Sequence, residues 1–415
     1  MLALYCCEMG MRERRPGAGG WLRTRAASAS RAAKLAALLL VPLAVAGCGY
    51  QRPTQILAGP MGTIEVEPPQ KGNYKEGRSL PWAEFVVKAA MNAYARPEEF
   101  PSDLALSKSR VQQELKTFNA APSAALWIGH ATFLIRTNGY TILTDPVFSQ
   151  GTSPVDDMGP QRYAPPALEI DQLPHIDAIM ISHNHYDHLD TRSLEQLAKR
   201  YPGAWVLVPK GNERLVKGTG FTRVHGFTAG QRVVSNGLTI TALPAYHETS
   251  RMGVDAHMTL ALGWSIRRHG APAMYFAGDT AYGPIFKQMR WIYGAHEVAF
   301  VPIGAYEPRS DVAHVHANPE EAAKIARELG AKVAIGMHWG TFPLADEPVM
   351  EPAVRFKKAP GNNRALKIGE TIVLNQHRSP EQAQATPKAI AQGAQGQPNA
   401  VAAPKVLALG DEQKN

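Results

Sequence analysis

The segment His183-Asn-His185-Tyr-Asp187-His188 constrains this chain more than any other feature. Four side chains of metal-binding type fall within six residues, directly after the apolar run 176–181. In an extended segment, residues i and i+2 share a face, so His183 and His185 can bind one metal ion. Asp187 and His188 lie on the following turn and can bind a second. The alternative is a polar surface loop without metal, and further ligand-type residues downstream argue against it.

Three such residues, His247, Asp279 and His338, each follow another apolar run. We expect His247 to complete the first metal site and His338 the second, with Asp279 giving one carboxylate oxygen to each. Gly278 would let the backbone come close at this point. Imidazole nitrogens and carboxylate oxygens suit zinc, so the sequence predicts two Zn²⁺ per chain. Such a pair can hold a bridging hydroxide, because zinc lowers the pKa of bound water to about 7.

The pattern of the rest of the chain predicts an α/β domain, because short apolar runs alternate with helical ones from about residue 124. The pairs Asn138-Gly139 and Asn236-Gly237 predict type I′ hairpins. Strands are expected at 125–128, 133–136, 140–144, 176–181, 205–208, 232–234, 238–243, 260–266, 273–276, 298–301 and 333–336. Helices are expected at about 107–118, 190–200, 283–292 and 318–330. A further helix from Pro81 carries an apolar stripe, which suits either core packing or a lip near lipid.

The N-terminus has the pattern of a secretory signal. A basic stretch to Lys34 precedes an apolar run and the small residues before Cys48. The ending Val45-Ala-Gly-Cys48 resembles the bacterial lipobox, which implies that residues 1–47 are removed and Cys48 is lipidated; an uncleaved anchor is the alternative. Both interpretations place the body at a membrane outside the cytoplasm. Gly49 resembles the pattern for retention at the outer membrane, facing the periplasm.

The remaining segments follow from composition. Residues 48–75 are predicted to be a tether, 76–375 the main α/β domain with an N-terminal helical lip, and 376–415 a disordered tail rich in Ala, Gln and Pro. The net charge is +8, but residues 1–47 hold seven basic and two acidic residues and so supply five of those charges. The nearly neutral body argues against a nucleic-acid partner.

The metal-binding loop resembles the His-x-His-x-Asp-His motif of the metallo-β-lactamase superfamily. That resemblance implies a four-layer αββα sandwich, with two mixed sheets flanked by helices and a dinuclear zinc site between them. Two more specific segments, Gly304-Ala-Tyr-Glu-Pro-Arg309 and His338-Trp-Gly-Thr-Phe342, are similar to those of N-acyl-phosphatidylethanolamine-hydrolysing phospholipases D. The resemblance covers about residues 78–375. It implies a membrane phospholipid substrate cleaved to phosphatidic acid and N-acylethanolamine, and a homodimer.

Several residues near the predicted centre have two interpretations each. Asp145 is either a residue that orients a metal ligand or the hydroxide without binding the metal itself, or a simple turn carboxylate. Tyr186 and His316 either contact the phosphate or leaving group, or pack at the rim. Arg309 either meets phosphate or forms an internal salt bridge. His130 is expected to set loop geometry only.

The sequence also departs from the family pattern, and rival functions remain. His316 matches a family histidine, but Val315 stands where the family has glutamine, which affects the expected headgroup contacts. A true β-lactamase is disfavoured by the bridging Asp279, and a nuclease by the modest charge and the lipid tether. Hydrolysis of another ester, lactone or phosphodiester stays open. A non-catalytic lipid-binding lipoprotein is disfavoured because all seven ligands are present.

Overall fold

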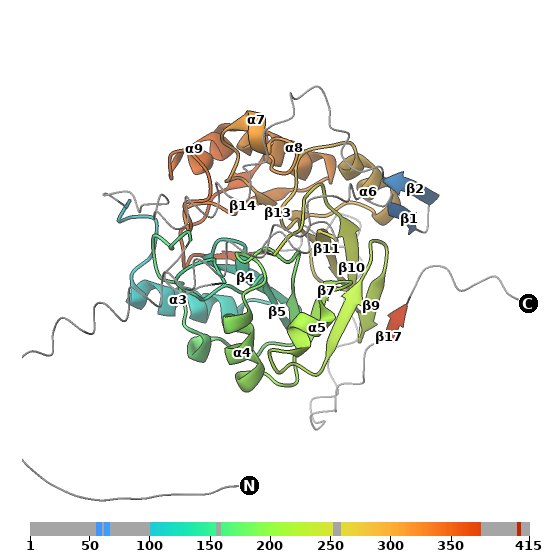
Figure 1. Cartoon of the computed structure of the whole chain (residues 1–415), viewed down its shortest axis with the longest axis horizontal. Helices are drawn as coiled ribbons and strands as arrows, with labels where there is room; N and C mark the ends of the chain where they lie inside the picture. Colours follow the sequence, from blue (N-terminus) through green and yellow to red (C-terminus); the bar gives the residue numbers. More distant parts are fainter. Residues whose placement is uncertain are drawn as a thin grey trace, which may run out of the picture. The chain divides into compact units, whose positions relative to one another are not determined.

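The computed structural model describes residues 100–154, 159–251 and 259–374, together with the backbone of three short strands outside these ranges (Figure 1). The described residues all belong to one compact unit, Gly49–Asn415. The predicted signal peptide, Cys48 and the predicted helix from Pro81 lie outside the described residues.

The first sheet has the strand order β16-β3-β4-β5-β6-β7-β8. Pairing is antiparallel from β16 to β5 and parallel from β5 to β8, so the sheet is mixed. Its strands are β3 (Ser123–Gly129), β4 (Thr132–Thr137), β5 (Tyr140–Thr144), β6 (Ala178–Met180), β7 (Trp205–Pro209), β8 (Val224–Phe227) and β16 (Thr371–Val373).

The second sheet has the order β15-β14-β13-β12-β11-β10-β9-β17. Pairing is parallel from β15 to β12 and antiparallel from β12 to β17. Its strands are β9 (Arg232–Ser235), β10 (Leu238–Pro244), β11 (Leu262–Arg268), β12 (Met274–Phe276), β13 (Val298–Pro302), β14 (Val333–Met337), β15 (Asn363–Arg364) and β17 (Lys405–Leu407). A separate pair, β1 (Gln55–Gly59) and β2 (Gly62–Val66), is antiparallel.

Helices cover the outer face of each sheet (Figure 1). Those of the first half are α3 (Lys108–Ala120), α4 (Thr191–Arg200) and α5 (Glu213–Lys217), with the 3-10 turn η2 (Ile170–Gln172). Those of the second half are α6 (Ile285–Tyr293), α7 (Arg309–Val312), α8 (Pro319–Glu328) and α9 (Glu351–Lys358). α8 begins at a capping box, in which Asn318 accepts from the Glu321 N–H and the Glu321 side chain accepts from the Asn318 N–H.

Two apolar cores hold the layers together. The smaller packs α3 and α4 on the first sheet, through residues such as Phe118, Leu197 and Ile179. The larger fills the space between the sheets and extends under the helices of the second half; Trp127, Trp264 and Phe300 belong to it. Strands that are apolar on both faces are typical of sheets covered on both sides. The architecture is therefore the expected αββα sandwich.

The main predicted elements are confirmed within a few residues. Both Asn-Gly pairs have positive φ at each residue, 41° and 95° for Asn138 and Gly139, as a type I′ turn requires. The sequence did not reveal α5, β8, α7, α9, β15 or β16. β1 and β2 fall within the predicted tether and β17 within the predicted tail; the boundaries of those segments stay predictions. Among the described residues, no helix is both long and apolar enough to cross a membrane.

Candidate metal centre

The candidate ligands gather where strands of both sheets end. His183 follows β6 and His247 follows β10, while Asp279 and His338 follow β12 and β14. Loops beyond the carboxyl ends of neighbouring parallel strands meet at one edge of a sheet, so the fold brings together residues up to 155 positions apart. All seven predicted ligands take part in this cluster.

The first group consists of His183, His185 and His247. Nδ1 of His185 lies 2.9 Å from Nε2 of His183 and 3.2 Å from Nε2 of His247. Nδ1 of His247 donates to the carbonyl oxygen of Val315 over 2.9 Å. Since that carbonyl can only accept, Nε2 of His247 presents a lone pair to the group, as a metal ligand must.

The second group consists of Asp187, His188 and His338. Oδ2 of Asp187 lies 3.4 Å from Nε2 of His188 and 3.3 Å from Nε2 of His338. Oδ2 of Asp279 lies 3.1 Å from Nε2 of His188 and 3.0 Å from Nε2 of His338. The same oxygen is 3.9 Å from Nε2 of His183 and 3.7 Å from Nε2 of His247, so it stands between the two groups.

These separations fit metal ligation. Four ligands held tetrahedrally at zinc distances of about 2.0–2.1 Å are separated by roughly 3.4 Å, close to the spacing in the second group. Nε2 of His188 and Nε2 of His338 lie near carboxylate oxygens but, within the part of the chain that the structure describes, form no well-aligned hydrogen bond, and neither does the buried Oδ1 of Asp279. Buried polar atoms of this kind need a partner, and a metal ion supplies one.

The charges of the cluster also favour a bound metal ion. Burial alone would raise the pKa of Asp187 and Asp279, but neighbouring histidines, His188 first, hold both pKa values well below the ordinary range. Burial would lower the pKa of His338, yet Asp279 and Asp187 raise it to about 9. Two buried carboxylates thus draw positive charge into the site, and bound cations would provide it.

A buried carboxylate behind the ligands sets their orientation. Oδ2 of Asp145 accepts from Nδ1 of His188 over 2.8 Å and from Oγ of Ser182 over 2.7 Å, and Oδ1 accepts from the Ser182 N–H over 2.7 Å. Oγ of Ser182 also lies 2.9 Å from Nδ1 of His183. Asp145 is fully buried and its oxygens are engaged in this way. Asp145 thus contacts His188 directly and His183 through Ser182, which fits the ligand-orienting interpretation better than that of a simple turn carboxylate. A role toward the hydroxide stays a prediction.

Gly278 makes this arrangement possible. Its φ is +60°, and a Cβ there would overlap the side chain of Ser182. The predicted close approach at Gly278 is therefore present, and the group it approaches is the serine that joins Asp145 to His183.

His130 contacts two residues of the metal centre, whereas the sequence predicted only a role in loop geometry. Its Nε2 lies 2.9 Å from Oδ2 of Asp187, and burial lowers the pKa of His130 to about 3, so the ring is neutral. Its backbone carbonyl accepts from the His338 N–H over 3.1 Å, and φ is 56°. His130 thus touches residues of the second group through both side chain and main chain. The position of His130 in the short turn between two predicted strands, 125–128 and 133–136, was the available signal.

The open side of the cluster carries the remaining candidates. His316 is half-buried, its ring centroid lies 4.9 Å from that of His247, and burial lowers its pKa to about 4. Tyr186 stacks under the guanidinium of Arg251 at 3.9 Å, and Arg251 also donates to the carbonyls of Asn184 and Leu189, so this pair braces the ligand loop. The contacts of His316 and Tyr186 with substrate stay predictions.

Arg309 forms an internal salt bridge, which was one of its two expected roles. Its Nη2 lies 2.9 Å from Oε2 of Glu321, and its Nη1 donates to the His316 carbonyl over 2.9 Å. The guanidinium thereby ties α7 to the start of α8 and fixes the backbone of His316. The predicted internal salt bridge is therefore present, and a phosphate contact is not tested by this structure.

Comparisons with known proteins agree with this geometry. Residues 140–339 match the family described as the β-lactamase superfamily domain. The chain is 35% identical to N-acyl-phosphatidylethanolamine-hydrolyzing phospholipase D 1 of Caenorhabditis elegans, over 60% of this chain and 73% of that one. It is 31% identical to a metal-dependent hydrolase of Aeropyrum pernix, over 59% of this chain and 95% of that one. A possible metal-dependent hydrolase of Veillonella parvula shares the fold, with a TM-score of 0.50, 18% identity and coverage of 61% and 99%.

The chain belongs to the β-lactamase superfamily. Its fold, its relatives and its clustered histidine and aspartate side chains define a metal-dependent hydrolase of that superfamily.

Proposed function

We propose that this hydrolase is a phosphodiesterase of phospholipase D type. It hydrolyses phospholipids that resemble N-acyl-phosphatidylethanolamine to phosphatidic acid and N-acylethanolamine. The position of Asp279 Oδ2, within 3.0–3.9 Å of four histidine nitrogens from both groups, is the observation that carries the proposal. A shared carboxylate between two metal sites suits in-line displacement at phosphorus, for which two neighbouring ions clamp the attacking and leaving oxygens.

Two zinc ions are the proposed cofactors. His183, His185 and His247 would hold one, Asp187, His188 and His338 the other, and Asp279 both. Such ions supply a nucleophile at neutral pH by lowering the pKa of water, and they polarise a phosphoryl oxygen. Zinc is preferred because imidazole and carboxylate ligands at these spacings suit its tetrahedral coordination.

The protein's own groups prepare the site. Asp145 and Ser182 fix the rings of His188 and His183, the Val315 carbonyl fixes His247, and His130 holds the carboxylate of Asp187. Ligand orientation of this kind raises both metal affinity and activity. At the open side, we expect the neutral ring of His316 to donate or accept a hydrogen bond at the departing headgroup oxygen.

The substrate class rests on similarity and on the predicted address of the protein. Among the relatives, the one from Caenorhabditis elegans is named as an N-acyl-phosphatidylethanolamine-hydrolyzing phospholipase D. We propose that lipidation of Cys48 tethers the domain to the bacterial outer membrane, facing the periplasm, where phospholipid is at hand. Val315 presents an apolar side chain where the family has glutamine, so we expect different headgroup contacts from those of the animal enzymes.

A product-resolved assay tests the proposal. Zinc-loaded full-length protein is incubated with N-acyl-phosphatidylethanolamine in detergent micelles, and products are identified by mass spectrometry. Phosphatidic acid and N-acylethanolamine should appear with the wild type and not with Asp279→Asn. If two metals are bound and this lipid is not cleaved, the phospholipase D assignment fails, and other phosphodiesters and then lactones become the substrates to examine.

A further inference from the structure

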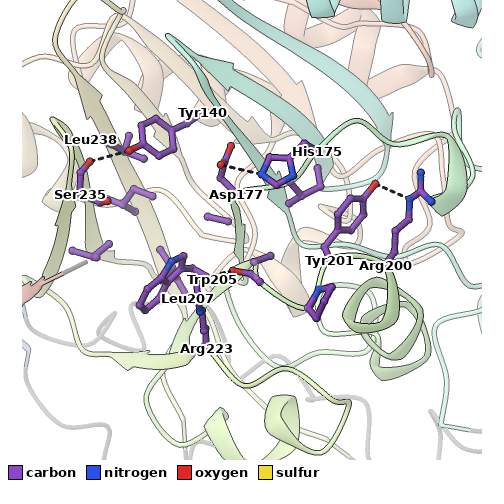
Figure 2. A pocket seen from close by; sticks show the side chains of 17 residues that line it. Tyr140, His175, Asp177, Arg200, Tyr201, Trp205, Leu207, Arg223, Ser235 and Leu238 are labelled. Atoms are coloured by element: carbon purple, nitrogen blue, oxygen red, sulfur yellow. Dashed lines mark hydrogen bonds and ion pairs between the residues drawn. The ribbon is translucent and has the colours of Figure 1, made fainter. Parts of the chain in front are cut away.

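Figure 2 shows a cavity of about 340 Å³. It lies at the end of the sandwich opposite the metal centre. It is bounded by the amino ends of β5, β6 and β7 and by the β9–β10 hairpin. Ala178 lines it, whereas His183, five residues further along, belongs to the metal cluster. Since extended chain advances about 3.3 Å per residue, the backbones of Ala178 and His183 can be at most roughly 16 Å apart. Its volume is within the range of small-molecule sites.

The inner wall of this cavity is apolar and is built by both sheets. Leu207 of β7 faces it from the first sheet, and Val233, Leu238 and Ile240 face it from the second. All four side chains are buried. Tyr140 closes one side, since its hydroxyl donates to the Ser235 carbonyl across the two sheets. The interior therefore favours an apolar chain over a polar ligand.

The mouth of the cavity is positively charged. Arg200 donates from Nη2 to the Asp171 carbonyl over 2.7 Å and from Nε to the Tyr201 hydroxyl over 2.9 Å. Arg223 donates from Nη1 to the Gly203 carbonyl over 3.2 Å. These partners are neutral, and within the described part of the chain neither guanidinium has a carboxylate within ion-pair distance. Both arginines are exposed, so their charge is available to a ligand.

The lining also holds one acid, which is engaged by groups other than the two arginines. Asp177 is the one carboxylate among the described residues around the cavity. Its Oδ2 accepts from the Thr141 N–H over 2.8 Å, and its Oδ1 lies 3.3 Å from Nε2 of His175 (Figure 2). The carboxylate is therefore held against the start of β5 and a histidine.

We propose that this cavity binds a single-chain amphiphilic anion, such as a medium-chain carboxylate. The apolar chain lies between the sheets, and the anionic head group lies at Arg200 and Arg223. Apolar walls with two uncompensated guanidinium groups at the opening are complementary to that class of ligand and reject an amphiphilic cation.

Isothermal titration of the metal-loaded full-length protein with decanoate, below its micelle concentration, tests the proposal. Decanoate should bind saturably, and decyltrimethylammonium should not. Arg200→Gln/Arg223→Gln should weaken decanoate binding by about fivefold or more and leave decanol binding unchanged. Lys357→Gln/Lys358→Gln makes the same charge change on exposed positions of α9 and should have no effect.

A second variant addresses the apolar part of the site. Ala204→Phe places a larger side chain on the cavity lining and should weaken decanoate and decanol alike, with thermal unfolding used to show that the variant is folded. Absence of saturable decanoate binding would overturn the proposal. So would binding that neither the double arginine variant nor Ala204→Phe alters, because the ligand would then lie elsewhere, for example at the metal centre.

Discussion

Oδ2 of Asp145 lies 2.8 Å from Nδ1 of His188, and the same oxygen accepts the hydroxyl of Ser182, which contacts His183. One buried carboxylate thus orients a histidine from each of the two ligand groups. An imidazole whose Nδ1–H is fixed in this way presents Nε2 toward the metal site.

Asp145→Asn should lower metal affinity and activity by about 10–100-fold, because the amide removes the charge that fixes both rings and places a donor in an acceptor position. Competition with a chelator measures the affinity directly. Asp171→Asn removes an exposed carboxylate in the same half of the molecule and should behave as the wild type. Unchanged metal affinity in Asp145→Asn would remove the positioning role.

Gly278→Ala should destabilise the fold around the centre by about 1–3 kcal/mol, because it combines a strained positive φ with overlap at Ser182. Chemical denaturation of the metal-loaded protein gives this free energy. Gly203→Ala is the matched control, since nothing lies near the added methyl group there. Equal stability of the two variants would show that the close approach to Ser182 is not needed.

His316→Ala should reduce turnover by about 100-fold and leave two metals bound, because its proposed partner is the leaving group. His316 could instead be a metal ligand, because it lies near His247 and Asp279 in a group that could hold an ion. Metal analysis beside the kinetic assay separates the two roles. Loss of a metal from His316→Ala would make this residue a ligand instead.

Cys48→Ser should release the protein from the membrane fraction without changing the activity of the domain toward micellar substrate. The lipobox-like ending Val45-Ala-Gly-Cys48 is the basis for this expectation. Fractionation and immunoblotting of expressing cells measure it. Retention of the variant in membranes would favour the uncleaved N-terminal anchor.

Much of the fold was accessible from local sequence signals. The Asn-Gly turns and the apolar runs fixed β4, β5, β9 and β10, because turn chemistry and burial on both faces act over a few residues. β16 was not foreseen, since its pairing with β3 joins residues about 250 positions apart. β6 is shorter than its apolar run, because the chain leaves the sheet at Ile181 to enter the ligand loop.

The candidate metal ligands could be named from the sequence, but the residues that hold those ligands in position could not. Each ligand follows an apolar run and has a side chain that chemistry singles out. Ser182 and the carbonyl of Val315 have no feature in the sequence that identifies them as supports of the site. Their roles depend on which residues lie beside them in the fold. His130 was underestimated for the same reason, because its contact with Asp187 spans 57 residues.

The central claim is a dinuclear centre that shares Asp279. Metal-free full-length protein, titrated with zinc while bound metal and hydrolysis of N-acyl-phosphatidylethanolamine are followed together, tests it most directly. We predict that activity rises to its maximum at about two zinc ions per chain, and that Asp279→Asn neither reaches that occupancy nor becomes active. Full activity at one zinc ion per chain, or a fully active Asp279→Asn protein, would contradict the account.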